Sequence, residues 1–192
     1  MDRRAALARL AAITGTIALG GELFVTGCRR ADKRAATPFA ASDVALLDEI
    51  GETILPTTDT PGAKSVGIGA FMTMMVNDCY DDDAHAAFQS GLTEIDERSR
   101  SRHGRSFLQC APAERHEILS VLDREQATQV KKRGETPHFF AMMKELTLLG
   151  YFSSETGCTK ALRYVETPGA FDGDVPYHKG DRAWFDPARR VG

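Results

Sequence analysis

Histidine is the residue best suited to acid–base or metal chemistry near neutral pH, and the chain has five. No two of them form an HxxxH or HExxH pair, and no cysteine stands near one at metal-ligand spacing. No serine lies in a GxSxG nucleophile elbow. We interpret the histidines as surface or hydrogen-bonded residues rather than catalytic or metal-binding ones: His85, His103, His116, His138 and His178.

Two groups of carboxylates could in principle do acid–base or cation chemistry. Asp48, Glu49 and Glu52 lie within one helical turn of each other, but they fall mostly on the polar side of an expected helix, so we predict a solvated face. The consecutive run 81–83 (Asp-Asp-Asp) lacks the alternation of a calcium loop. We predict that this run caps the following helix, where acidic side chains accept bonds from free amides.

The cysteines show no redox or zinc spacing. Cys79, Cys110 and Cys158 are an odd number beyond Cys28, and no two of them form CxxC. Two interpretations remain open: three buried thiols acting as small apolar side chains, or one disulfide and one free thiol.

The net charge of the chain limits the classes of partner that it is expected to bind. The chain has 24 Lys and Arg against 27 Asp and Glu, a formal net charge of −3. A mildly acidic chain without a basic face argues against nucleic acid as a partner.

The elements that must position these residues are helices. Apolar residues recur at intervals of three or four through most of the chain, which predicts an amphipathic helix each time. The segment 138–152 is the most hydrophobic of them and is expected to be central. The expected helices span 43–55, 68–79, 83–101, 112–129, 138–152 and 155–164.

The connecting and terminal segments are expected to be irregular. Prolines and a glycine make 56–63 a rigid loop. Turn dipeptides and aromatic residues follow 164 and predict an extended C-terminal arm from about residue 166. We therefore predict an all-α fold: a single helical domain of about six helices with an irregular C-terminal arm.

The N-terminus has the pattern of an export signal. Arg3 and Arg4 precede an apolar, glycine-rich run over 11–25, which is too short to span a membrane as a helix. The arginine pair resembles a twin-arginine signal, which directs export of folded proteins. An ordinary secretory signal is the alternative. Either one predicts a periplasmic protein.

The apolar run ends at Val-Thr-Gly-Cys, residues 25–28, which resembles a lipobox. In that interpretation Cys28 is the cleavage and lipidation site that attaches the protein to a membrane surface. The alternative is an unlipidated cysteine in a discarded or uncleaved signal. The expected organisation is a signal over 1–28, a linker over 29–41 and a helical domain over 42–192.

Two internal stretches carry a family resemblance together with the arginine-bearing signal. They are LLDEIGETILPTTDTPGAKSVGIGAF at 46–71 and GYFSSETGCTKALRYVETPGAFDGDVPY at 150–177. With the signal, they resemble the gluconate 2-dehydrogenase subunit 3 family, the small subunit of membrane-associated flavoprotein dehydrogenases. The resemblance covers nearly the whole chain.

The resemblance implies a partner and not a catalytic site. In this family the small subunit binds a large FAD-dependent dehydrogenase subunit of the GMC type, in some complexes with a multihaem cytochrome c. The small subunit carries the export signal for both. We therefore expect no cofactor in this chain, FAD in the partner and no catalytic residue here. The oxidised substrate, a sugar, sugar acid or alcohol, belongs to the partner.

Two hypotheses of different classes follow. The first is a non-catalytic escort subunit whose proline, glycine and aromatic loop residues contact the partner. The second is a stand-alone exported helical enzyme or small-ligand-binding protein that uses scattered carboxylates and histidines. The residues expected at the partner interface are Pro56, Pro61, Gly62, Phe71, Tyr151, Phe152, Tyr164, Phe171, Tyr177 and Trp184.

Overall fold

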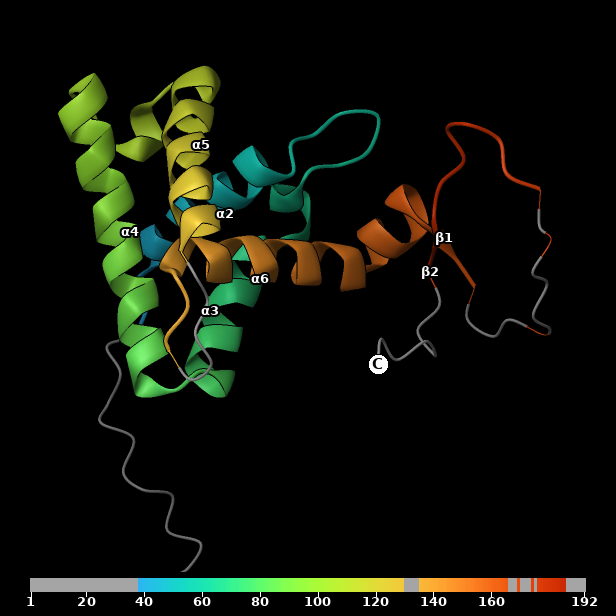
Figure 1. The fold of residues 1–192 in the computed structure, drawn as a ribbon, viewed down its shortest axis with the longest axis horizontal. Helices are drawn as coiled ribbons and strands as arrows, with labels where there is room; N and C mark the ends of the chain where they lie inside the picture. The colour runs from blue at the N-terminus through green and yellow to red at the C-terminus, as the bar shows by residue number, and fades with distance from the viewer. Residues whose placement is uncertain (1–37, 130–134, 166–168, 170–173, 175, 186–192) are drawn as a thin grey trace, which may run out of the picture. The chain divides into compact units, whose positions relative to one another are not determined.

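The computed structural model describes residues 38–129, 135–165, 169, 174 and 176–185, all within one compact unit of residues 36–192. Helices dominate these residues (Figure 1). The α-helices are α2 (Ala41–Ile54), α3 (Ile68–Cys79), α4 (Asp82–His103), α5 (Pro112–Thr128) and α6 (Phe139–Ser153). The shorter elements are the 3₁₀-helices η1 (Ala63–Val66) and η2 (Phe107–Gln109), the π-helix η3 (Gly157–Ala161), and the strands β1 (Arg163–Tyr164) and β2 (Trp184–Phe185).

The predicted all-α class is confirmed. Among the described residues the only strands are β1 and β2, each two residues long, and they pair in parallel. None of the described helices has both the length and the apolar character needed to cross a membrane.

Polar side chains at the helix starts explain where the helices begin. The Asp81 carboxylate accepts a hydrogen bond from the Ala84 amide at 2.8 Å, so the predicted acidic cap of α4 is confirmed. Helix α2 begins two residues before the predicted start, because Asp43 reaches back to accept from the Ala40 amide at 2.8 Å. The ring of His138 caps α6 by accepting from the Phe140 amide at 3.1 Å.

Helix α6 lies at the centre of the core, as its hydrophobicity predicts. It contacts α2, α3, α4 and α5, and in Figure 1 it runs across the other helices. Its buried surface is wider than the single apolar stripe of an amphipathic helix, because other helices contact it on several sides. The buried residues of α6 are Phe139, Phe140, Met142, Met143, Leu146, Thr147, Gly150 and Tyr151.

Some large apolar residues of these helices are exposed. Leu149 on α6 is 49% exposed and Met74 on α3 is 51% exposed. Each belongs to a strongly apolar segment in which periodicity alone does not separate the inner from the outer face. The neighbouring Met72 and Met143 are completely buried, as expected for methionine in a core.

The sixth predicted helix is shorter than expected. Helical structure after α6 ends with η3 at Ala161, where the Leu162 amide donates to the Gly157 carbonyl oxygen at 3.1 Å. A Cβ atom at Gly157 would overlap the carbonyl oxygen of Tyr151, so glycine permits this turn to pack against the end of α6. Arg163 and Tyr164, predicted to end the helix, form β1 instead.

Candidate functional site

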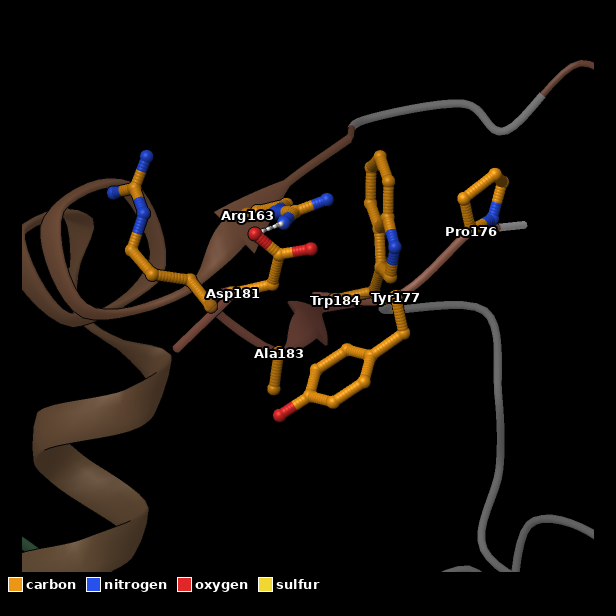
Figure 2. A pocket seen from close by; sticks show the side chains of 7 residues that line it. Arg163, Pro176, Tyr177, Asp181, Ala183 and Trp184 are labelled. Atoms are coloured by element: carbon orange, nitrogen blue, oxygen red, sulfur yellow. Dashed lines mark ion pairs between the residues drawn. The ribbon is translucent and has the colours of Figure 1, made fainter. Parts of the chain in front are cut away.

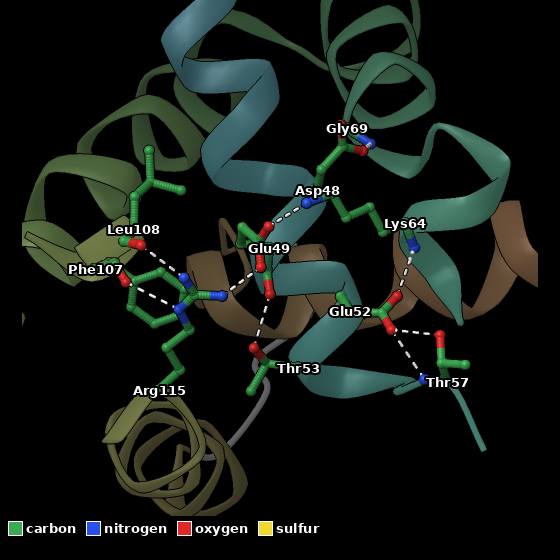
Figure 3. Close-up of polar contacts among 10 residues, drawn as sticks. All are labelled: Asp48, Glu49, Glu52, Thr53, Thr57, Lys64, Gly69, Phe107, Leu108 and Arg115. Carbon is green, nitrogen blue, oxygen red and sulfur yellow. Dashed lines mark hydrogen bonds and ion pairs between the residues drawn. The ribbon is translucent and has the colours of Figure 1, made fainter. Parts of the chain in front are cut away.

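One carboxylate of α2 holds the proline-rich loop that follows it. Glu52 accepts hydrogen bonds from the amide and hydroxyl of Thr57, at 2.9 and 2.7 Å, and from the Lys64 amide at 3.0 Å (Figure 3). These contacts join the beginning of the loop to η1 at its end. The loop over residues 55–62 therefore has a defined shape despite its lack of regular structure.

A second carboxylate, Glu49, lies between two cations. It pairs with Lys64 of η1 and with Arg115 of α5, and its side chain is only 19% exposed. Burial opposes ionisation of Glu49, but the hydrogen bonds and charges of Lys64 and Arg115 outweigh burial and hold its pKa below the ordinary value. Arg115 also donates to the carbonyl oxygens of Phe107, at 3.1 Å, and Leu108, at 2.6 Å.

The third carboxylate fixes the start of α3. Asp48 accepts a hydrogen bond from the Gly69 amide at 2.7 Å (Figure 3). The prediction that Asp48, Glu49 and Glu52 form a solvated face was wrong. All three are partly buried: Asp48 binds α3, Glu49 binds η1 and α5, and Glu52 binds the loop and η1, because the chain folds back over this side of α2.

The proline-rich loop also meets α6. The Tyr151 hydroxyl donates a hydrogen bond to the Pro61 carbonyl oxygen at 2.6 Å. A Cβ atom at Gly150 would overlap the side chains of Ile68 and Phe71, so α3 packs closely on α6 here. The two stretches 46–71 and 150–177 therefore contact each other in the fold.

This packing changes the status of several expected interface residues. Tyr151 is only 3% exposed and Gly62 is buried, so both serve the interior and not a partner-binding surface. Phe71 and Phe152 are partly buried against the core, and Pro61 is half-buried. Pro56 is exposed. Sequence reasoning placed Tyr151 and Gly62 outside because aromatic and glycine residues in loops are common at both interfaces and turns.

The remaining expected interface residues belong to the C-terminal arm. Tyr164 is 44% exposed, Trp184 56% and Tyr177 74%. Phe171, the export-signal residues Arg3 and Arg4, and the lipidation residue Cys28 lie outside the described residues.

Trp184 and Tyr177 line a half-open pocket at the paired strands (Figure 2). Arg163 and Trp184 are register partners, and the Arg163 guanidinium lies 5.2 Å from the centroid of the Trp184 ring. Arg163 also pairs with Asp181 at 3.1 Å. The pocket, called here the arm pocket, is lined by Arg163, Pro176, Tyr177, Asp181, Arg182, Ala183 and Trp184.

Sequence reasoning missed the charged residues that organise both regions. Arg115 offers a signal, because it is in register with the apolar stripe Ile118, Leu119 and Leu122, where a cation needs a partner. Arg163 offers none. Its contacts with Asp181 and Trp184 join parts of the chain that have no common periodicity.

One buried histidine and the three described cysteines lie within the helical domain. His85 is buried, with its ring Nε2 3.1 Å from the Asn77 side-chain oxygen. Cys110 and Cys158 are buried free thiols, and Cys79 is an exposed free thiol. Of the two interpretations, the structure therefore supports free thiols, although Cys79 is not buried. Within the described residues, no group of three His, Cys, Asp or Glu side chains could hold a metal ion.

Comparison with known proteins identifies the family of this all-α protein. The family model described as gluconate 2-dehydrogenase subunit 3 matches residues 41–169. The chain belongs to this family. No curated protein and no solved structure matches the chain. Family membership supports an accessory subunit of a dehydrogenase complex, in association with the other subunits of that complex.

Proposed function

We propose that this chain is the non-catalytic small subunit of a periplasmic, membrane-associated dehydrogenase complex. It binds a large FAD-dependent subunit of the GMC type and escorts it through twin-arginine export. A multihaem cytochrome c joins some complexes of this kind. The observation that carries the proposal is the family match over residues 41–169. The buried core residues of the described helices all fall within this range, so the match covers the helical domain and not a short motif.

The N-terminal residues support the escort role. Arg3 and Arg4 precede the apolar run over 11–25, in the arrangement of a signal for folded cargo. A flavoprotein that folds around its flavin in the cytoplasm needs such a route, and one signal on a bound subunit suffices for both chains. Lipidated Cys28 or an uncleaved signal then holds the complex at the membrane surface.

The internal contacts support a non-catalytic role. The carboxylates most favourably spaced for chemistry, Asp48, Glu49 and Glu52, bind amides and cations of this same chain. Groups engaged in this way stabilise the fold and are poorly placed to exchange protons with a substrate. The chemistry of the complex is therefore assigned to the flavin of the partner.

The test is to isolate the tagged protein from its native membranes, record the absorption spectrum and identify the chains that co-purify. We expect a stoichiometric flavoprotein. Changing Arg3 and Arg4 together to lysine should remove both chains from the periplasm. The control is the same change at Arg29 and Arg30, a second arginine pair in the N-terminal region. A colourless protein without a partner, or turnover of a sugar acid by the isolated chain, would contradict the proposal.

Membrane attachment has a separate test. Replacing Cys28 by serine removes the thiol that lipidation requires, so more of the complex should appear in the soluble periplasmic fraction. Cys79→Ser is the matched control, because Cys79 is exposed and lies in the helical domain. An unchanged distribution for Cys28→Ser would favour an uncleaved signal as the anchor.

A further inference from the structure

Hydrogen bonds fix the backbone that frames the arm pocket. The His178 amide donates to the Asp181 carboxylate at 2.9 Å, and the Asp181 amide donates back to the His178 carbonyl oxygen at 2.9 Å. The turn between them includes Gly180 at φ +99°, a conformation that favours glycine. The Arg182 guanidinium donates to the carbonyl oxygens of Thr159, at 3.1 Å, and Lys160, at 2.9 Å, which ties the turn to the helical body.

The rings on this frame are turned outward. Tyr177 is 74% exposed and Trp184 is 56% exposed, although both are large enough to contribute strongly to a core. Figure 2 shows the Trp184 ring between Arg163 and Pro176, with Tyr177 beside it. Tryptophan, tyrosine and arginine are the residue types that most often dominate the binding energy of protein interfaces. A rigid frame also lowers the entropy cost of binding.

Size and charge restrict what fits the pocket. Its volume is about 320 Å³, at the lower end of the range for small-molecule pockets, and it is half-open to solvent. The ionisable groups lining it in the described residues, apart from Tyr177, are Arg163, Arg182 and Asp181, which leaves a net positive charge. An open, aromatic, positively charged pocket of this size suits one large side chain next to a carboxylate.

We propose that the arm pocket receives a large apolar or aromatic side chain, flanked by an acidic residue, from an extended segment of the partner flavoprotein. This inference rests on the proposed function and assigns the contact to a particular part of the surface. Trp184 and Tyr177 supply the apolar contact, and Arg182 lies at the site of the acidic residue. Arg163 and Asp181 hold the Trp184 ring in place.

The experiment uses the full chain, produced in its native host together with its complex. The readout is the flavin bound per small subunit after membrane solubilisation and dilution. Trp184→Ala and Tyr177→Ala should each weaken retention of the flavoprotein about tenfold or more. Trp184→Phe keeps an aromatic ring and should restore part of the retention. Arg182→Gln removes one positive charge from the pocket and also the bonds of Arg182 to Thr159 and Lys160, so it should lower retention and make the remaining retention less sensitive to salt.

Leu148→Ala is the control, because Leu148 is exposed on α6 and outside the arm pocket. The Leu148→Ala variant should retain as much flavoprotein as the unchanged protein does. Helical circular dichroism should be the same for all variants, because the described helices pack without Trp184.

The outcomes separate the two proposals. If the unchanged protein retains flavoprotein and the Trp184 and Tyr177 variants retain as much, the pocket assignment is overturned and the proposed function stands. If the unchanged protein carries no flavoprotein, both are overturned. A photo-crosslinker at position 177 should label the flavoprotein. Labelling of a second copy of this chain would instead make the pocket a self-association site.

Discussion

The hydroxyl of Tyr151 donates a hydrogen bond to the carbonyl oxygen of Pro61, with 2.6 Å between the two oxygens. The two residues are 90 positions apart in the chain. This bond joins the proline-rich loop to the central helix α6, and both residues belong to the stretches on which the family resemblance depends. Tyr151 is therefore a structural residue at the junction of the two stretches.

Removal of the Tyr151 hydroxyl should lower the free energy of unfolding. Tyr151→Phe keeps the buried ring but leaves the Pro61 carbonyl without its partner, which costs about 1 kcal/mol. Urea unfolding followed by circular dichroism measures the change. Tyr177→Phe is the control, because Tyr177 is 74% exposed and should give no change. Equal effects of the two substitutions would show that the Tyr151–Pro61 bond contributes nothing.

Gly69 should not tolerate a side chain. A Cβ atom there would overlap the backbone carbonyl oxygen of Val44, which a rotamer change cannot relieve. Gly69→Ala should therefore destabilise the protein by about 1–3 kcal/mol, as overpacking does elsewhere. Gly169→Ala is the matched control, because a Cβ atom at Gly169 meets nothing within 4 Å. Its effect should stay within about 0.5 kcal/mol. The measurement is thermal unfolding of both variants. An unchanged melting temperature for Gly69→Ala would contradict the close packing of α3 on α2.

Stability should fall in acid. Hydrogen bonds and cations hold the pKa of five carboxyl groups below their ordinary values, in Glu49, Glu114, Asp123, Glu125 and Asp181. A carboxyl whose folded-state pKa is lowered binds its proton more readily in the unfolded chain. For the glutamates this stabilisation is fully present above the ordinary pKa of 4.5, and it is lost as the pH falls through the lowered value.

The substitution Glu49→Gln tests this dependence at one site. It removes the charge that Lys64 and Arg115 share, so the variant should be less stable at neutral pH and should lose less stability in acid. The measurement is urea unfolding at a series of pH values. Glu97→Gln, at an exposed position of α4, is the control and should follow the unchanged protein. A parallel acid response for Glu49→Gln would exclude a contribution from this cluster.

The three described cysteines should differ in reactivity. Cys79 is exposed, whereas Cys110 and Cys158 are buried. Burial also raises the pKa of the Cys110 thiol, so less of the reactive thiolate forms. Iodoacetamide should modify Cys79 in the native protein, and the other two only after unfolding, as read by peptide mass spectrometry. A disulfide between any two of the three would contradict the structure.

The local pattern of the sequence determined the helices and the class of fold. Apolar spacing located α2 to α6 within a few residues of their observed ends, because an amphipathic helix depends on residues three and four positions apart. Asp81 could be assigned as a cap for the same reason, since its partner, the Ala84 amide, is only three residues away.

The tertiary structure decided which residues on the helices meet. Glu49 and Arg115 are 66 positions apart, so no local period relates them, and only the folding of α5 against α2 makes Glu49 an ion-pair partner. The same reason applies to Tyr151, which is buried because α6 crosses the end of the proline-rich loop. In the arm, the β1–β2 pairing brings Arg163 to Trp184 and forms the pocket. Contacts of this kind depend on the path of the whole chain, and that path is set by the packing of the complete core.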